Sequence, residues 1–308
     1  MLLNTHTALP DWAYAYGGAY SQGIIRRAPD DFIVNEIPSF EPSGKGEHAF
    51  VFIEKCSENT EYVARALARF AGVRQRDVSY AGLKDRHART TQWFSVWLPG
   101  KPDPDWTALN SDTIKVLQAT RHSKKLKRGS LAGNQFILRI HDWVGEQTIL
   151  EQQLQRIKVG GVPNYFGEQR FGHGAGNITK ALALFAGEKV SRNQRSLYLS
   201  AARSYLFNHI LSARVANESW DQALSGDALM FDNSHSFFPA TELDESIIER
   251  VKQLDMHPTG VLWGKGEQQV SADVALLEEQ VLSQHAELAQ GLIAFAMQQD
   301  RRVLRSHI

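Results

Sequence analysis

The chain has 308 residues, of which 43% are hydrophobic and 22% charged, so it is long enough for two ordinary domains with a buried core. Its single cysteine, Cys56, excludes an internal disulfide and a thiolate zinc cluster, and favours a reducing cytoplasm. The net charge is zero, but residues 113–141 hold seven Lys and Arg side chains and no acid, so a polyanion would meet a local basic patch. No uncharged apolar run is long enough to span a membrane, and the N-terminal residues lack a basic segment before their short apolar start; we expect neither membrane insertion nor secretion.

The first half of the chain is typical of strands around one helix. A helix is expected over residues 59–72, because Val63, Leu67 and Phe70 share one stripe, Asn59 or Thr60 can cap its start, and Gly72 ends it. The basic run 121–133 is expected in a loop or at a strand edge. Strands are expected on both sides of a Pro-Asp turn in residues 23–36, and at 48–55, 77–83, 91–99 and 134–143.

From about residue 145 the pattern changes to helix-length segments. Helices are predicted over residues 147–161, 196–216 and 272–305. In the second of these, Leu199, Ala202, Leu206 and Ile210 form an apolar stripe that predicts core packing. The shift in composition predicts a boundary near residue 158, between a strand-rich first domain and a helix-richer second one.

Several site chemistries find no support in the pattern. The eleven histidines show no spacing typical of a metal site, so we expect no metal. The glycine-rich segment 171–185 lacks the GxGxxG and GK[ST] patterns, so it predicts a turn before a helix capped near Asn177. There is also no GxSxG nucleophile motif.

Aromatic side chains recur beside cations, as in proteins that stack single-stranded or flipped nucleotides. Each ring by itself is more often a core residue than a stacking platform. The aromatic residues in question are Phe32, Tyr80, Trp93, Phe136, Tyr165, Phe166 and Phe171.

One carboxylate, Asp85, lies inside a basic run and directly after the small-residue turn Ala81-Gly82. The pattern alone favours an ion-paired turn residue. The functional alternative is a carboxylate that the surrounding cations keep ionised so that it can act on a sugar. The cations expected to do so are Lys84, Arg86 and Arg89.

Six segments in order resemble the TruD family of tRNA pseudouridine synthases. They are YAGLKDRHARTTQ (80–92), which contains Asp85, together with RRAPDDFIVNE (26–36), LAGNQFIL (131–138), KVGGVPNYFGEQRFGHGAGN (158–177), YLSAARSYLFN (198–208) and GDAL (226–229). The resemblance implies an α+β fold in two parts. Residues 1–158 would form a pseudouridine synthase catalytic core of mixed, mostly antiparallel sheet with helices, and residues 159–308 an α/β insertion domain.

The same resemblance implies the reaction and its residues. The substrate would be uridine 13 of tRNA, and no cofactor would be needed. Asp85 matches the catalytic aspartate, and Phe32 and Asn134 match positions that contact the target nucleotide. Further substrate contacts are expected at Phe136, Arg26 and Lys84. An RNA-phosphate path is expected at Arg121, Lys124, Lys125, Lys127 and Arg128.

Two questions stay open at this stage. Asp85 could add to C1′ of the ribose or remove the C2′ proton. The resemblance also implies C-terminal strands that follow the helix expected to end within QQDRRVLRSHI (298–308) and that complete the pocket; without them, a tRNA-binding or RNA-folding protein without catalysis is the alternative. A glycosidase-like hydrolase would need a second carboxylate that the sequence does not identify. The chain is expected to act as a cytoplasmic monomer without a protein partner.

Overall fold

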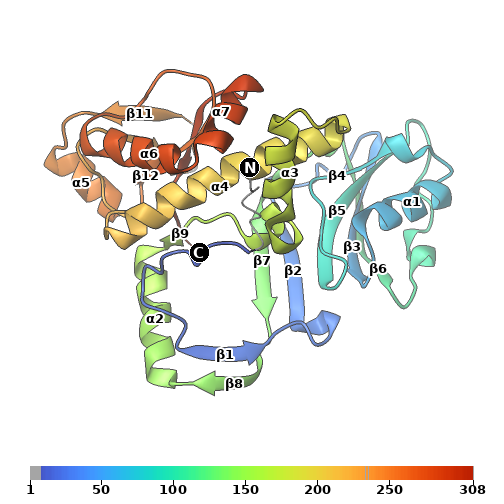
Figure 1. The fold of residues 1–308 in the computed structure, drawn as a ribbon. Coiled ribbons are helices and arrows are strands. Elements are labelled where there is room, and N and C mark those ends of the chain that lie inside the picture. The colour runs from blue at the N-terminus through green and yellow to red at the C-terminus, as the bar shows by residue number, and fades with distance from the viewer. Residues whose placement is uncertain (1–7, 233, 235, 308) are drawn as a thin grey trace. The chain divides into compact units, whose positions relative to one another are not determined.

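The computed structural model describes residues 8–232, 234 and 236–307. The chain forms two compact units. We call residues 21–145 the sheet unit, and residues 146–308 together with the N-terminal residues up to Tyr20 the helical unit. Each is described by itself (Figure 1). In the described part of the chain, none of the helices combines the length and apolar composition that a membrane span requires.

A six-stranded, mostly antiparallel sheet dominates the sheet unit. Its order is β6-β3-β5-β2-β7, with β4 also pairing with β5. β2 and β5 form the one parallel pair described in this sheet. The strands are β2 (Phe32–Pro38), β3 (His48–Cys56), β4 (Val78–Tyr80), β5 (Arg89–Trp97), β6 (Ile114–His122) and β7 (Leu131–Leu138), and a separate ribbon pairs β1 (Ser21–Ile24) with β8 (His141–Gly145).

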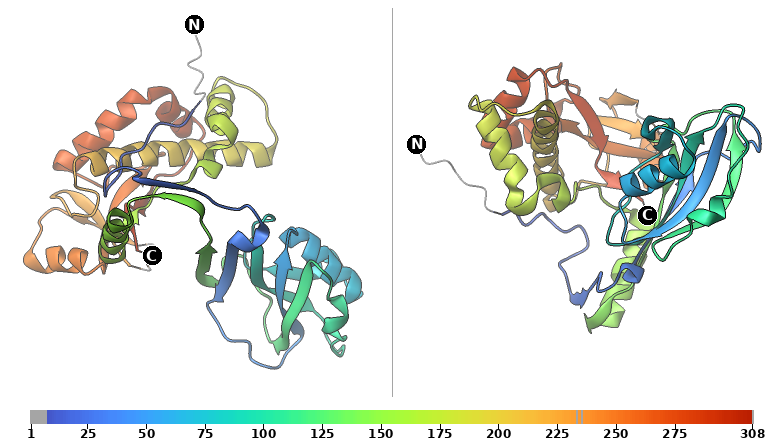
Figure 2. Two further views of the ribbon diagram at one scale, coloured as in Figure 1. Left: turned by 90° about the horizontal axis from the view of Figure 1, so that it is seen from below. Right: turned by 90° about the vertical axis from the view of Figure 1, so that its right-hand side faces the viewer.

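Helix α1 (Thr60–Phe70) packs on one face of this sheet. Its apolar stripe meets Val51 and Phe94, whose side chains point to that face because residues alternate along a strand. Figure 2 shows α1 against the strands from two further directions. Gly72, with φ of 61°, ends the helical segment in a left-handed conformation that costs glycine little. Three 3₁₀ turns complete the unit: η1 (Pro29–Asp31), η2 (Gln75–Asp77) and η3 (Trp106–Leu109).

The helical unit is built around the 25-residue helix α4 (Arg192–Ala216). Ser191 caps α4 by accepting a hydrogen bond from the amide of Gln194, and the predicted apolar stripe of α4 is buried, as expected. α3 (Gly176–Phe185), α6 (Ala272–Gln284), α7 (Ala286–Ala294) and the 3₁₀ turn η4 (Glu168–Phe171) pack against it. The unit also contains α2 (Gln147–Gly160), α5 (Glu245–Lys252) and the 3₁₀ turn η5 (His173–Ala175). A sheet of order β11-β10-β12-β13 contains β10 (Asp227–Phe231), β11 (Phe237–Ala240), β12 (Met256–Leu262) and β13 (Asp300–Val303), while β9 (Val162–Pro163) pairs with β14 (Arg305–Ser306).

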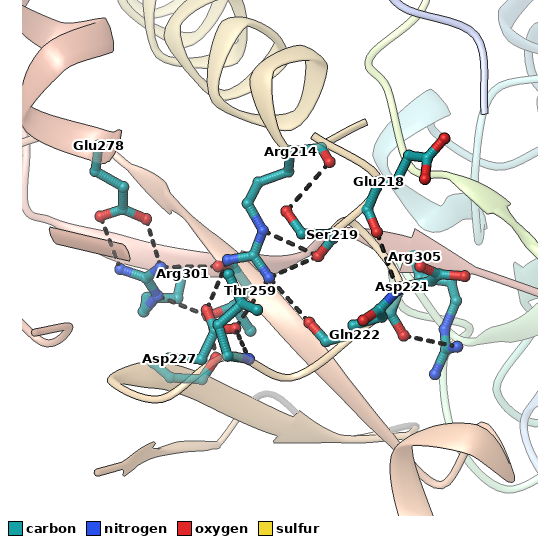
Figure 3. Close-up of polar contacts among 12 residues, drawn as sticks. Arg214, Glu218, Ser219, Asp221, Gln222, Asp227, Thr259, Glu278, Arg301 and Arg305 are labelled. Carbon is teal, nitrogen blue, oxygen red and sulfur yellow. Dashed lines mark hydrogen bonds and ion pairs between the residues drawn. The ribbon is translucent and has the colours of Figure 1, made fainter. Parts of the chain in front are cut away.

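Buried ion pairs join helix to sheet inside this unit (Figure 3). Arg214 of α4 donates from both terminal nitrogens to the two carboxylate oxygens of Asp227, at 3.0 and 2.9 Å. Arg301 of β13 donates to Glu278 of α6 and to both oxygens of Thr259. All of these side chains are buried, so their charges and hydrogen-bonding groups are satisfied inside the protein.

The fold confirms the α+β class, and three element predictions need correction. The strand expected over 134–143 is two strands, β7 and β8, and β6 was not predicted. The helix expected over 272–305 is two helices, α6 and α7, the second of which ends at Ala294. After it, Asp300–Val303 form β13 and Arg305–Ser306 form β14. Ala296 has φ of 54°, which breaks the helix, and pairing of Asp300–Val303 with β12 overrides the helix propensity of the Arg-rich segment.

The boundary between the two compact units follows Gly145, not residue 158. The assignment of residues 1–158 to a catalytic domain and 159–308 to an insertion domain is a statement about function, and it stays a prediction.

Candidate active site

The edge of the sheet at β2 and β7 gathers several of the predicted site residues on one face. Alternation along β2 places Phe32, Val34 and Glu36 on that face. Across the pair, Val34 is opposite Phe136 and Glu36 is opposite Asn134, so these side chains share it. The ring of Phe136 is 57% exposed on the edge strand β7. The pairing of β2 with β7 therefore brings together Phe32, Asn134 and Phe136, three of the residues proposed from the sequence to contact the substrate.

The loop between β4 and β5, residues 81–88, is fastened beside this face. The backbone amide of Lys84 donates to Thr60 Oγ1 at the start of α1, at 2.9 Å. The Lys84 ammonium meets Glu36 Oε2 at 2.7 Å, with both side chains buried. Glu36 Oε1 also accepts from the amide of Trp93. The loop is thus held by buried polar contacts to β2, β5 and α1.

Asp85 projects from this loop with its side chain 36% exposed. Its Oδ1 accepts a hydrogen bond from the amide of His87 at 3.1 Å. Its Oδ2 lies 3.7 Å from a guanidinium nitrogen of Arg26. Arg26 has φ of 60°, a left-handed conformation that is uncommon for a residue with a Cβ and that occurs at functional sites. The carboxylate is therefore oriented but still reachable from solvent.

Three planar groups follow one another next to Asp85. The Arg26 guanidinium lies 4.1 Å from the centroid of the Phe32 ring. Phe32 in turn stacks on Phe136, with centroids 6.1 Å apart and an interplanar angle of 10°. Phe32 is buried, so the exposed surface on which a base could stack belongs to Phe136.

Asn134 adds an unsatisfied polar atom to the same face. Its side-chain oxygen is buried and has no hydrogen-bond donor among the described residues. Buried acceptors without a partner are uncommon and call for an explanation. A ligand with an N–H or O–H group would supply the missing donor.

The cations expected around Asp85 are engaged by other groups, and a different cation takes their place at the carboxylate. Lys84 pairs with Glu36, Arg89 pairs with Asp30 and Glu54, and Arg86 donates to the backbone oxygen of Ser57. Side chains adjacent in sequence point in different directions, so closeness along the chain was a poor guide. Arg26, from a distant segment, is the cation at the carboxylate.

Comparison with known proteins decides the family. The sequence model of "tRNA pseudouridine synthase D (TruD)" matches residues 12–184 and 176–298. Curated proteins named tRNA pseudouridine synthase D are similar: that of Methylococcus capsulatus is 52% identical over 96% of this chain and 84% of its own length, and that of Nitrosococcus oceani is 48% identical over 94% and 83%. The chain belongs to the TruD family. A TruD crystal structure from Methanosarcina mazei has the same fold, with a TM-score of 0.75 and 21% identity over 98% of this chain and 87% of that one.

The basic run of this TruD chain divides into an engaged residue and an exposed loop. Arg121 binds Asp103 and the backbone oxygens of Leu98 and Lys101, and is largely buried. The loop after it is anchored by Leu126, which is buried and whose amide donates to Ser95 Oγ. The predicted RNA-binding residues at which the loop is exposed are Lys124, Lys125, Lys127 and Arg128.

Next to this loop is a hollow of about 650 Å³, which we call the basic groove. Arg128 lies over the ring of Tyr80, 4.8 Å from its centroid, and donates to its hydroxyl. The lining of the basic groove contains four cations and no acid. It consists of Ala64, Gln75, Arg76, Val78, Ser79, Tyr80, Lys125, Leu126, Lys127 and Arg128. Such a surface favours an anion.

Two charged residues of the TruD site were missed from the sequence. Glu36 occupies an inward position of β2 and Lys55 an inward position of β3. In both strands the alternation calls for an apolar residue at that position. A charged residue at an inward position of a strand, where the neighbouring inward residues are apolar, could have identified both in the sequence.

A group of three side chains in the helical unit has the residue types of a metal site. Ligand atoms of Asp232, His257 and His307 lie within 4.8 Å of one another. However, Arg305 donates to Nδ1 of His257, and burial lowers the pKa of that ring. The proton of the neutral ring then sits on Nε2, which faces Asp232 at 3.2 Å. This geometry fits a hydrogen-bonded chain better than a metal ligand.

Proposed function

We propose that this TruD chain is a tRNA pseudouridine(13) synthase and that Asp85 is its catalytic carboxylate. The observation that carries the assignment is the partly exposed carboxylate of Asp85 next to Arg26, whose guanidinium lies over Phe32. Phe32 in turn stacks on the exposed Phe136, and β7 also carries the unsatisfied oxygen of Asn134. Family membership and the named relatives support the reaction and the tRNA substrate.

The reaction itself requires little more than a positioned carboxylate. The N1–C1′ bond of uridine breaks, the uracil turns, and C5 bonds to C1′; C5 loses its proton and N1 gains one. Asp85 serves either by adding to C1′ or by removing the C2′ proton. There is no net redox change, so we propose that no cofactor or metal takes part.

The neighbours of Asp85 fit the needs of a flipped uridine. Removing a base from its stack costs a few kcal/mol, which stacking on an aromatic ring helps to offset. In our proposal Phe136 offers that ring, with Phe32 behind it. The oxygen of Asn134 accepts the N3–H of uracil, and Arg26 orients the carboxylate of Asp85. Lys84 supports the loop through Glu36.

We propose that tRNA phosphates lie along the exposed basic loop and its groove. Lys124, Lys125, Lys127 and Arg128 are placed to hold them, whereas Arg121 is engaged by Asp103. The sheet unit would then hold the catalytic site, with residues 159–308 as the insertion domain. A cytoplasmic monomer acting on tRNA completes the proposal.

Replacing Asp85 by Asn tests the assignment. We expect Asp85→Asn to abolish tritium release from tRNA labelled at C5 of uridine, because the amide cannot act as nucleophile or base. Its affinity for tRNA should stay within about twofold of wild type, a difference below about 0.5 kcal/mol. Asp112→Asn, an exposed acid of the same unit, is the matched control and should keep full activity.

Two results would contradict the proposal. Substantial tritium release by purified Asp85→Asn would remove Asp85 from the reaction. A wild-type chain that binds tRNA without releasing tritium would instead favour a binding protein.

A further inference from the structure

Lys55 lies in the interior of the sheet unit at a position that the strand pattern reserves for apolar side chains. Along β3, Ala49, Val51 and Ile53 point into the core beneath α1, and alternation places Lys55 on the same face. Its neighbour across the β3–β5 pair is Thr90. The exposed fraction of Lys55 is 0%.

The contacts of Lys55 lead to the candidate catalytic residue. Its ammonium donates a hydrogen bond to the backbone oxygen of Asp85, at 2.8 Å. Among the described residues this is the one hydrogen bond recorded for its side chain, and no carboxylate lies within ion-pair distance of it. An ammonium has three donors, so Lys55 is poorly satisfied for a buried charge.

Stability does not explain such a residue. A buried charge is expensive unless it is paired and fully hydrogen-bonded, and an apolar side chain of similar size is often as good or better for the fold. Lys84, which is also buried, has a carboxylate partner in Glu36. Lys55 has instead the peptide group of Asp85.

We propose that Lys55 is a positioning residue for the reaction: its ammonium fixes the peptide of Asp85 from beneath and places a positive charge behind the carboxylate. This inference rests on the proposed role of Asp85. The charge stabilises the anion that the reaction needs, and the hydrogen bond holds the loop in the orientation in which the carboxylate of Asp85 meets Arg26.

Protonation of Lys55 should appear in the pH dependence of the reaction. Burial lowers the pKa of Lys55 to about 8, while the attraction of Asp85 opposes that shift. The other groups that act on it are Lys84 in the loop, Cys56 at the end of β3 and Glu58 after that strand. The ammonium is charged below pH 8 and loses its proton above it, so kcat should fall as the pH rises through that value.

Replacing Lys55 by Met tests the proposal, because Met keeps the length and removes both charge and donor. We expect kcat for tritium release to fall about 10- to 100-fold, because misplacing a reacting group by about 1 Å can cost about 10²-fold. The Kd for tRNA should stay within twofold, and the Tm should equal or exceed that of wild type. The fall of kcat between pH 7 and 9 seen in wild type should be absent in the variant.

Ile53→Met, two residues earlier on the same face, is the matched control and should keep wild-type kcat and pH profile. Lys55→Gln keeps a donor without the charge and serves if the Met variant does not fold; its kcat should also fall and lose the dependence on pH. Unchanged kcat in Lys55→Met overturns the proposal, as does a loss of kcat matched by a lower Tm with the wild-type pH profile retained.

Asp85→Asn measured in the same series distinguishes a failure of the proposed function from a failure of the proposal for Lys55. An active Asp85→Asn overturns the proposed function and this inference with it. An inactive Asp85→Asn beside a fully active Lys55→Met overturns this inference alone.

Discussion

Buried cations in the helical unit have more hydrogen-bond and ion-pair partners than Lys55 has in the sheet unit. In the helical unit, Arg214 and Arg301 each meet a carboxylate and further oxygens. Arg305 pairs with no carboxylate among the described residues, but its donors reach three backbone oxygens and the ring of His257. In the sheet unit, Lys84 also meets a carboxylate, that of Glu36, but Lys55 has one hydrogen bond among the described residues, to the peptide of Asp85. Satisfied charges are consistent with a structural role, and a poorly satisfied one next to a candidate site is better explained by chemistry.

Breaking a satisfied pair in the helical unit should have the largest effect on stability. Arg214→Met leaves the carboxylate of Asp227, which is 0% exposed, without its partner. We expect the free energy of unfolding to fall by about 3–5 kcal/mol, measured by denaturant titration. Arg250→Met, which removes an exposed pair with Asp255, should cost less than about 1 kcal/mol. Equal losses in the two variants would contradict the distinction between buried and exposed pairs.

Lys84→Met tests the contrast between the paired Lys84 and the poorly satisfied Lys55 within the sheet unit. Its cost in free energy of unfolding should be somewhat smaller than that of Arg214→Met. It leaves Glu36 buried and unpaired, at a cost of about 3 kcal/mol, and it releases the loop that carries Asp85. Stability and tritium release should therefore fall together, whereas Lys55→Met should lose activity without losing stability. The double variant Lys84→Met/Glu36→Leu removes both charges and should recover most of the lost Tm. A Tm that stays low in the double variant would show that the pair does more than balance charge.

Neutralising the exposed basic loop should have the smallest effect on the fold. Changing Lys124, Lys125 and Lys127 to Gln should alter the free energy of unfolding by less than about 0.5 kcal/mol. Binding of tRNA should weaken, and each lost phosphate contact should reduce the slope of log K against log salt by about 0.7–0.9. Arg121→Gln, at an engaged cation, is the control and should leave the slope nearly unchanged. An unchanged slope in the triple variant would remove the loop from the RNA path.

The regular elements with strong patterns could be predicted from the sequence. Runs rich in β-branched and aromatic residues predicted β2 and β3, and the apolar stripes predicted α1 and α4. The end of the chain could not be predicted in this way, because Asp300–Val303 has no strand pattern of its own and becomes a strand by pairing with β12. Likewise β6 carries many polar residues and exposes much of its surface, so its sequence resembles that of a loop.

Several members of the candidate site were proposed from the sequence, but Glu36, Lys55 and the connections between the members were not. Arg26, Phe32 and Asp85 came from the family resemblance, and the structure brings them within contact. The pairing of Lys84 with Glu36 could not be foreseen, since it depends on how β2 lies relative to the loop after β4. Lys55 could have been flagged, because a lysine that continues the row of Ala49, Val51 and Ile53 is out of place in an apolar pattern.

The parallel pairing of β2 with β5 has a consequence for the order of folding. Parallel neighbours require a long crossover, which here contains β3, α1 and β4, and β7 reaches β2 only about a hundred residues after Phe32 has been made. Contacts between such distant segments form late because the intervening chain must first be closed. During synthesis β2 therefore lacks its β7 neighbour until Leu138 has left the ribosome, and the face shared by β2 and β7 is among the last parts of the sheet unit to assemble.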